Sequence, residues 1–201
     1  MQLNYEAARR EAQQQVDAGL IQGGVIATTR ADEIIVVGRQ CVKPVERPMT
    51  EHSRFDIASV GKVFTTACIA RYIIEGRVDP DAPITRYIPE YVLGEACEIT
   101  VRDLAMHVSG FDNSKPYNSF EAEVFDRELF NKRPVRPRLE AFEYACSNFI
   151  MLGKIVNRLS GLDLDAFARR HVWGPLGMTA TTWNAPGDGP HEVEHWFPNR
   201  P

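Results

Sequence analysis

Several features that mark specialised proteins are missing from this sequence of 201 residues. No apolar run approaches the roughly 20 residues that a membrane-spanning helix needs, so we expect no membrane span. The N-terminal stretch is polar and lacks the apolar region of a secretory signal, which favours a cytoplasmic location. The net charge of -4 argues against a nucleic-acid-binding protein. With 44% hydrophobic and 25% charged residues, the chain has the composition of an ordinary globular protein.

Cysteine is also scarce. The four cysteines are Cys41, Cys68, Cys97 and Cys146, and no two of them have the C-x-x-C spacing of zinc or redox motifs. We therefore expect reduced thiols, which agrees with a cytoplasmic protein, and we expect no cofactor.

Apolar periodicity and the placement of glycine and proline predict a short β-hairpin followed by helices. The expected strands cover residues 25–29 and 34–37, and the longer expected helices cover residues 4–19, 59–76 and 147–159. Two short helices are also expected. Thr100 can act as the N-cap of the first, and Asp163 or Asp165 can act as the N-cap of the second. Prolines predict irregular structure over residues 38–54 and 111–140. Because a lone hairpin is marginal, the sheet should contain further strands that this chain does not supply.

Ser59 and Lys62 form an S-x-x-K tetrad at the head of an apolar segment that runs to Gly76. On a helix these two side chains lie one turn apart on the same face. A neighbouring base activates a serine hydroxyl, and a buried lysine can be that base because burial disfavours its charged form. By itself the tetrad also fits a helix N-cap at Ser59 and a surface lysine at Lys62. The segment is apolar nearly all round, which predicts a buried helix and favours the catalytic interpretation.

The C-terminal tail contains a literal H-E-x-x-H motif at His191, Glu192 and His195. On a long helix the two histidines would bind zinc, and the glutamate would act as the base of a peptidase. Pro190 and Pro198 leave room for fewer than three helical turns, and no third ligand is evident. We interpret the motif as a chance occurrence and keep a zinc peptidase as the weakest alternative.

Two other polar features are interpreted as structural. His107 is expected to hydrogen-bond the turn at Ser109 and Gly110. Four basic side chains follow closely in a proline-rich stretch, Lys132, Arg133, Arg136 and Arg138. They are expected to form a solvated face, and the alternative is a clamp for a substrate carboxylate.

Four blocks of sequence occur in a recognisable order, at residues 55–62, 99–111, 142–153 and 175–179. Together they resemble the serine β-lactamase and penicillin-binding-protein-like hydrolases. The closest branch comprises the class C-type β-lactamases, the related esterases and the D-Ala-D-Ala carboxypeptidase-like proteins. One such block can arise by chance, whereas four in order are specific. The resemblance implies a β-lactamase-like α/β fold, in which helices flank an antiparallel sheet and a helical region is added.

The resemblance also assigns roles to matching positions. Ser59 would be the acylated nucleophile, and Lys62 would accept or relay its proton. Tyr144 matches the tyrosine of the family's Y-x-N motif, which helps to move the proton to the leaving group. The third position of that motif, a substrate-binding position that is usually Asn or Asp, is Cys146 here. A thiol is a weaker hydrogen-bonding group than an amide.

The family's third motif, Lys-Thr-Gly or His-x-Gly, lies on a later strand that also supplies a second oxyanion N–H. No such strand is found before Pro201, so we expect the chain to be the N-terminal portion of one incomplete domain. Its expected parts are a helix and hairpin over residues 1–58, the nucleophile helix and helical region over residues 59–185, and an irregular tail over residues 186–201.

The function implied is that of a serine hydrolase that transfers the acyl group of an ester, amide or β-lactam to Ser59. Its partner would be a small-molecule or peptide substrate with a scissile acyl bond, and no nucleic acid. A homodimer or a complementing C-terminal segment would complete the open sheet. The alternative is a catalytically silent fragment or pseudoenzyme of the same fold.

Overall fold

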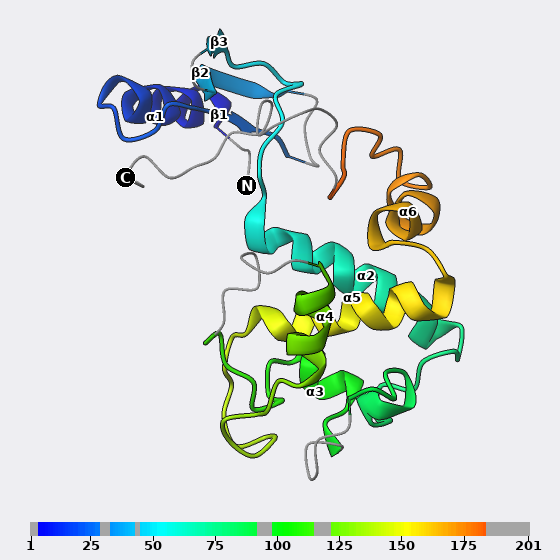
Figure 1. Cartoon of the computed structure of the whole chain (residues 1–201). Helices are drawn as coiled ribbons and strands as arrows, with labels where there is room; N and C mark the ends of the chain where they lie inside the picture. The colour runs from blue at the N-terminus through cyan, green and yellow to red at the C-terminus, as the bar shows by residue number, and fades with distance from the viewer. Residues whose placement is uncertain (1–3, 29–32, 43–44, 92–97, 115–121, 184–201) are drawn as a thin grey trace. The chain divides into compact units, whose positions relative to one another are not determined.

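The computed structural model describes residues 4–28, 33–42, 45–91, 98–114 and 122–183 (Figure 1). The backbone forms two compact units, and the boundary between them lies between Ile57 and Ala58. The first unit contains the sheet, and the second contains the helical region. Within the described ranges, no helix combines the length and the apolar character that crossing a membrane requires.

The described residues of the first unit form one helix and a three-stranded antiparallel sheet with strand order β1-β2-β3. The elements are α1 (Tyr5–Asp17), β1 (Gly23–Ile26), β2 (Ile35–Val42) and β3 (Val45–Pro48). Asn4 caps α1 by accepting a hydrogen bond from the backbone N–H of Ala7 (2.9 Å). The third strand shows that our expectation of a loop over residues 38–54 was wrong.

The physical reason for this difference lies in Pro48 and Gly38. Proline has no N–H to donate, but Pro48 lies at the end of an edge strand, where no ladder bond is lost. Gly38 has a φ of 71°, and a Cβ at this position would lie 2.2 Å from the carbonyl oxygen of Gln22. Only glycine fits there. β2 also changes its pairing partner at this point, because Gly38 pairs with Gly23 of β1 and Arg39 pairs with Pro48 of β3.

The S-x-x-K segment opens the second unit. It forms a 3-10 turn at Ala58–Val60, which leads directly into α2 (Gly61–Ile74). Ser59 therefore lies one turn before the regular helix rather than at its first position. Glu75 caps the end of α2, and Gly76 takes the left-handed conformation with a φ of 70°. The expected end of the helix near Gly76 is confirmed.

α2 is buried along one face only. The buried side chains include Thr65, Cys68, Ile69 and Tyr72. Val63 is 63% exposed and Ile74 is 86% exposed, and both lie on the opposite face. Within the part of the chain that the structure describes, the expectation of a helix buried on all sides is therefore wrong. α2 instead carries a second apolar face that is open to solvent.

The other helices of the described residues are a 3-10 turn at Ile84–Arg86, α3 (Val101–Ala105), α4 (Ala122–Phe130), α5 (Cys146–Ser160), α6 (Leu164–Ala168) and a π-helical turn at Arg169–Trp173. Thr100 and Asp103 form the capping box that the sequence predicts for α3. Asp163 is the N-cap of α6, and its side chain accepts a hydrogen bond from the N–H of Ala166 (2.7 Å). α4 corrects the expectation that residues 111–140 are wholly irregular.

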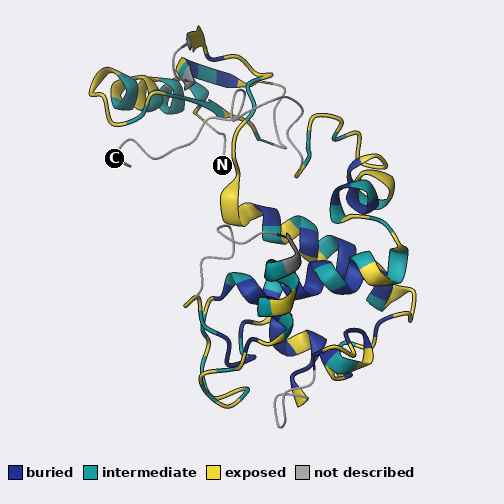
Figure 2. Ribbon diagram, viewed as in Figure 1, coloured by how far each residue is buried: buried dark blue, intermediate teal, exposed yellow. Residues whose placement is uncertain are grey.

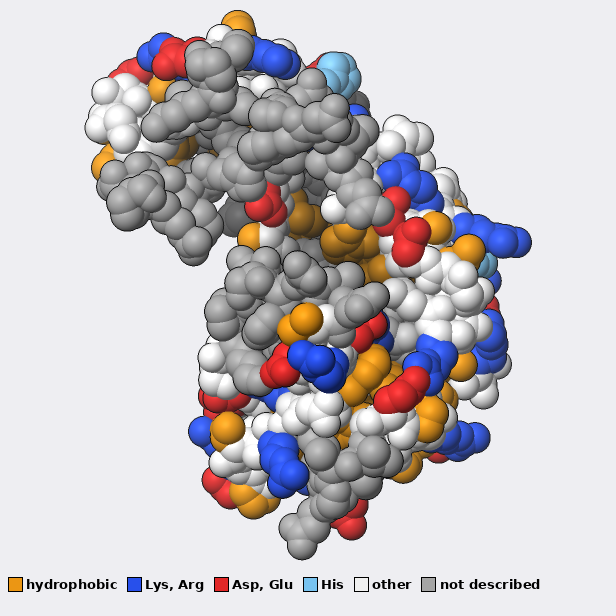
Figure 3. Space-filling view, in the orientation of Figure 1, with side chains coloured by type: hydrophobic (Ala, Val, Ile, Leu, Met, Phe, Trp, Pro, Cys, Tyr) orange, Lys and Arg blue, Asp and Glu red, His pale blue; other side chains and the backbone are white. Residues whose placement is uncertain are grey.

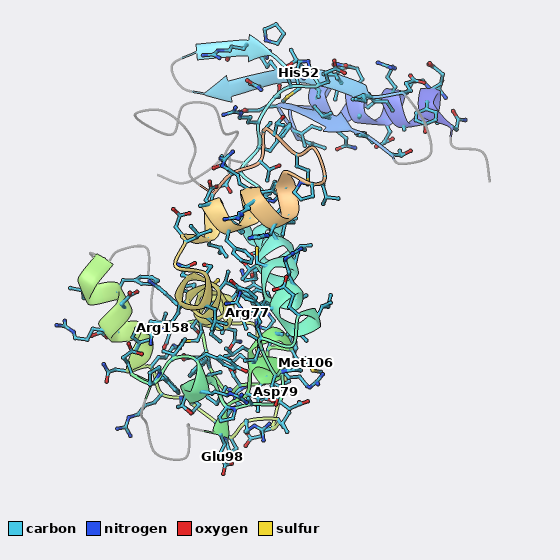
Figure 4. The ribbon with its side chains drawn as sticks, turned by 90° about the vertical axis from the view of Figure 1, so that its right-hand side faces the viewer. His52, Arg77, Asp79, Glu98, Met106 and Arg158 are labelled. Carbon is cyan, nitrogen blue, oxygen red and sulfur yellow. The ribbon has the colours of Figure 1, made fainter. Side chains whose placement is uncertain are left out.

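The hydrophobic core of the second unit forms where α2 and α5 lie side by side (Figures 1 and 2). Tyr72 of α2 packs against Phe167, with ring centroids 5.1 Å apart, and Phe64 packs edge-on against Trp173. Arg77 follows the end of α2 and donates a hydrogen bond to the carbonyl of Leu159 in α5 (2.9 Å; Arg77 is labelled in Figure 4). This packing fixes the two helices that carry the candidate site.

Candidate active site

The structure brings Ser59, Lys62 and Tyr144 together. The side-chain nitrogen of Lys62 donates a hydrogen bond to Ser59 Oγ at 3.0 Å. The hydroxyls of Ser59 and Tyr144 are hydrogen-bonded to each other. Lys62 Nζ also lies over the Tyr144 ring, 4.8 Å from its centroid. One nucleophilic hydroxyl thus contacts two groups that can exchange protons with it.

These three side chains come from two places in the fold. Ser59 and Lys62 approach each other because the 3-10 turn and α2 place residues three positions apart on one face. Tyr144 lies on the extended stretch just before α5, where Ala145 has β backbone angles. It reaches Ser59 because α5 packs against α2. The expectation that these residues share one site agrees with this arrangement.

The backbone at Ala58 is unusual. Its φ of 44° is positive, which an L-amino acid with a Cβ rarely adopts. Strain of this kind costs about 1–3 kcal/mol and is concentrated at functional sites. The residue that carries it immediately precedes Ser59, at the start of a helical segment. The first N–H groups of a helical segment have no intrahelical partner, so they can stabilise negative charge that develops beside them.

Cys146 occupies the position where the Y-x-N motif has an amide. Its Sγ lies 3.7 Å from Lys62 Nζ, and its backbone N–H donates a hydrogen bond to Asn113 Oδ1 at 2.9 Å. The side chain is half-buried at the first residue of α5. The position therefore faces the site, although a thiol provides only a weak hydrogen-bonding group there.

Among the described residues, Cys68 and Cys146 are free cysteines, and the expectation of reduced thiols stays a prediction. Cys68 is fully buried in α2, and burial raises its pKa to about 11. Cys97 lies outside the described residues, and the side chain of Cys41 is likewise not described.

His107 belongs to the site, which was not expected from the sequence. Its Nδ1 accepts hydrogen bonds from the N–H of Ala145 (3.2 Å) and from Nδ2 of Asn148 (3.0 Å). The expectation that its side chain bonds the turn at Ser109 and Gly110 is therefore wrong. Burial, followed by the positive charge of Lys62, holds the pKa of His107 below its ordinary value.

The basic side chains of the proline-rich stretch are mostly paired within the protein. Lys132 is buried and bonds Asp112 (2.8 Å), and Arg138 forms two bonds to the buried Asp103. Arg136 pairs with Glu143. These pairs correct our interpretation of a solvated face, and they leave three of the four cations already engaged by carboxylates of the protein.

The charges on the second unit are of both signs. On the face drawn in Figure 3, Lys and Arg side chains are interspersed with Asp and Glu. Burial would raise the pKa of Asp112, but hydrogen bonds from Lys132 and Ser114 outweigh it and hold that pKa below its ordinary value.

A cavity of about 320 Å³ opens beside Lys62 and Cys146. Its walls come from α2, α5 and the segments that follow: Ala58, Gly61, Lys62, Thr65, Cys146, Phe149, Ile150, Gly153, Lys154, Asn157, Leu164 and Trp183. The hollow is mainly apolar and large enough for a small acyl group, and Lys62, which bonds Ser59 Oγ, forms part of its wall.

The H-E-x-x-H motif with His191 and His195 lies outside the described residues. Among the residues that the structure describes, no group of three or more His, Cys, Asp or Glu side chains is arranged to hold a metal ion.

Sequence reasoning also missed Asn148 and Ser109, both of which are buried. Ser109 Oγ donates a hydrogen bond to Asn148 Oδ1 (2.6 Å) and accepts one from the N–H of Phe111 (3.2 Å). The available signal was a polar Ser147-Asn148 pair directly before the apolar run at residues 149–152. Buried polar groups of this kind are retained where their hydrogen bonds are satisfied.

Comparison with solved structures shows the same architecture in larger proteins. A class C beta-lactamase superposes with a TM-score of 0.77 at 18% identity, over 94% of this chain and 54% of that chain. The D-amino acid amidase from Ochrobactrum anthropi SV3, complexed with L-phenylalanine, superposes with a TM-score of 0.71 at 26% identity, over 87% of this chain and 50% of that chain. The β-lactamase-like fold expected from the sequence is confirmed, and it is present in part.

Sequence comparison leads to the same group. A Salmonella gallinarum (strain 287/91 / NCTC 13346) protein named "Putative D-alanyl-D-alanine carboxypeptidase" is 24% identical over 152 residues, which cover 67% of this chain and 35% of that protein. The chain therefore spans about half of the solved relatives and about a third of this one. Residues 8–201 match the family model described as Beta-lactamase. On this match, which covers nearly the whole sequence, the chain belongs to the beta-lactamase family of serine hydrolases and penicillin-binding-protein-like enzymes, and corresponds to its N-terminal portion.

Proposed function

We propose that the protein is a serine hydrolase that acts by acyl transfer through Ser59. The observation that carries this proposal is the contact of Ser59 Oγ with both Lys62 Nζ and Tyr144 Oη. A serine between two proton-exchanging groups, directly after a strained backbone residue, is the arrangement that nucleophilic catalysis requires.

In this mechanism Ser59 Oγ attacks the carbonyl carbon of the substrate and forms a tetrahedral intermediate. Lys62 takes the serine proton, directly or through Tyr144, and Tyr144 passes a proton to the leaving oxygen or nitrogen as that bond breaks. Water then attacks the acyl carbon and gives up one proton to Lys62 or Tyr144. The bond between Ser59 Oγ and the acyl carbon breaks, Ser59 Oγ takes that proton back, and the acid is released. The backbone N–H of Ser59 would stabilise the oxyanion in both steps.

The substrate is an ester, an amide or a β-lactam. The relatives include a class C beta-lactamase, a D-amino acid amidase and a protein named as a carboxypeptidase, and all three activities break an acyl bond. The apolar cavity beside Lys62 would receive the non-reacting part of the acyl group. The residues that hold the scissile bond and the cavity all belong to the second unit.

We also propose that both units belong to one β-lactamase-like domain, completed by a C-terminal segment or by a second copy of the chain. The exposed apolar side chains Val60, Val63 and Ile74 support a partner of this kind. A second candidate function is ligand binding without turnover, in a fragment or pseudoenzyme. It is favoured by the weak hydrogen-bonding group that Cys146 places in the site.

The test is the reactivity of Ser59. A fluorophosphonate probe should label Ser59, as identified by peptide mass spectrometry, and a chromogenic ester should be hydrolysed. Ser59→Ala should abolish labelling and lower turnover by at least about a thousandfold. Ser53→Ala is the matched control, because Ser53 lies in a turn of the other unit. Undiminished ester hydrolysis by Ser59→Ala would refute the assignment, and labelling without turnover would favour the silent alternative.

A further inference from the structure

We infer that His107 is a positioning residue for Tyr144, which it holds in place against Ser59. This inference rests on the proposed function, because it assigns a role in the same site. His107 lies after α3, far from Tyr144 in the sequence, and it is 8% exposed. Three independent sets of contacts connect it to the segment that carries Tyr144.

The first set is formed by the main chain on both sides of Tyr144. The carbonyl of His107 accepts a hydrogen bond from the N–H of Glu143 at 2.8 Å. Its Nδ1 accepts one from the N–H of Ala145 at 3.2 Å. The residues on both sides of Tyr144 are thus hydrogen-bonded to His107. These bonds fix the backbone position from which the Tyr144 side chain projects.

The second set is aromatic. The His107 and Tyr144 ring centroids are 4.8 Å apart with an interplanar angle of 32°. Phe149 covers the imidazole at 5.1 Å, and Phe142 approaches it at 5.7 Å. The imidazole ring therefore limits the rotation of the Tyr144 ring while Tyr144 Oη reaches Ser59.

The third set is a buried polar chain that orients the imidazole itself. Ser109 Oγ donates to Asn148 Oδ1 at 2.6 Å, so the amide nitrogen of Asn148 faces His107 Nδ1 at 3.0 Å. Two donors then converge on Nδ1, which must be the unprotonated nitrogen of the ring. The neutral imidazole is also the form that burial and the neighbouring Lys62 favour, since both lower the pKa of His107.

The backbone of His107 supports a role beyond filling space. Its φ of 57° is in the left-handed region, which histidine adopts more often than most residues and which ends α3, where the N–H of Val108 donates to the carbonyl of Asp103 (3.0 Å). That conformation lets the carbonyl and the side chain of the same residue both reach the Glu143–Ala145 stretch. A residue that only packed in the core would not need the acceptor nitrogen.

Two substitutions separate the contacts. His107→Phe keeps an aromatic ring against Tyr144 but removes the acceptor. His107→Asn keeps an acceptor near the position of Nδ1 and tolerates a positive φ, but it removes the stacked ring. Each is combined with Tyr144→Phe in a double-mutant cycle, and kcat and KM for a chromogenic ester are measured with the protein as its gene encodes it.

Each His107 variant should lower kcat about tenfold when Tyr144 is present, with KM nearly unchanged. In the Tyr144→Phe background the same substitution should change kcat by no more than about twofold, because the group that it positions is already gone. An equal loss of kcat in both backgrounds would overturn the inference and leave a purely structural role. If His107→Phe does not fold, the cycle with His107→Asn decides.

A second readout does not depend on activity. NMR spectra with labelled tyrosine rings, assigned by comparison with Tyr144→Phe, should show the Tyr144 resonances displaced in His107→Asn while the other tyrosine signals stay in place. Unchanged Tyr144 resonances would overturn the inference. A failure of Ser59 to react with any acyl probe would refute the proposed function, and the NMR result would still decide the positioning role.

Discussion

Lys62 Nζ lies 3.7 Å from the sulfur of Cys146. The same nitrogen donates to Ser59 Oγ at the shorter distance of 3.0 Å. The lysine therefore has one firm hydrogen bond to the nucleophile and one weak contact to a thiol. An amide oxygen in place of the sulfur would provide Lys62 with a stronger acceptor.

Cys146→Asn should consequently raise the rate of ester hydrolysis or change the preference between esters and amides. The amide oxygen would accept a hydrogen bond from Lys62 and hold it more firmly. The amide N–H would donate a hydrogen bond to a carbonyl of the substrate. Steady-state kinetics on a panel of esters and amides measures the effect. Cys146→Ala is the matched control, since it removes the thiol without adding a hydrogen-bonding group. Unchanged kinetics in Cys146→Asn would show that this position does not influence the substrate.

Lys62→Arg should acylate at least about a hundredfold more slowly than the wild type. Arginine retains the positive charge over the Tyr144 ring but stays protonated, so it cannot accept the Ser59 proton. Stopped-flow measurement of acylation isolates this step from deacylation. Near-native acylation would identify Tyr144 or water as the base instead, and Lys154→Arg provides a control lysine from the cavity wall.

The two described thiols should differ in reactivity. Cys68 is fully buried with a pKa of about 11, whereas Cys146 is half-buried and lines the cavity. At about pH 8, iodoacetamide should modify Cys146 and leave Cys68 untouched in the folded protein, because the thiolate is the reacting form. Peptide mapping by mass spectrometry gives the extent at each site. Prior modification of Cys146 should also block labelling of Ser59 by the serine-directed probe. In Cys146→Ser, the same iodoacetamide treatment should leave Ser59 open to labelling. Faster modification of Cys68 would contradict the burial of α2.

Stability should depend on pH through His107. Its folded pKa is lowered, so the unfolded chain binds the proton more readily, and the free energy of unfolding rises with pH across this range. As the pH falls from about 7.5 through the ordinary histidine value toward the lowered pKa, the folded state should lose stability. Urea unfolding of wild type and His107→Asn at several pH values measures the slope. The variant should have a shallower slope, and His171, whose pKa is also lowered, accounts for part of what remains.

Asp103 should be a stronger determinant of stability than Thr100, although both form the same capping box. The Asp103 carboxylate accepts from the N–H of Thr100 at 2.9 Å and from Arg138 at 2.7 Å, and it is 2% exposed. Asp103→Ala should cost about 3 kcal/mol, because it leaves a guanidinium without its partner. Thr100→Ala should cost about 1 kcal/mol, because it removes one cap. Equal losses in urea unfolding would show that the bond to Arg138 contributes little.

Much of the helical region could be predicted from the sequence because its signals are local. The Thr100 cap, the Asp163 cap and the glycine end at Gly76 each depend on a few neighbouring residues, and the structure places them where expected. Ser59 and Lys62 are close for the same reason, since a single helical turn joins them. The pairing with Tyr144 came only from the family resemblance, because no local pattern connects α2 to the start of α5.

The errors have the opposite origin. β3 was missed because Pro48 opposes a strand locally, while the pairing with β2 that stabilises β3 is a tertiary contact. The basic residues near Lys132 were misinterpreted because their carboxylate partners, Asp103 and Asp112, lie elsewhere in the chain. The imidazole of His107 was assigned to the nearest turn, whereas its partners follow 38 and 41 positions later.

The hydrogen bond between Ser59 and Tyr144 joins residues 85 positions apart. During synthesis, the Ser59–Lys62 pair can form once α2 is helical, whereas Tyr144 is added long afterwards and reaches Ser59 only when α5 docks on α2. In a nascent or half-folded chain, Ser59 would therefore lack Tyr144 and react slowly. Reactivity would arise at the moment of helix docking, so a serine-directed probe added during refolding would time that event.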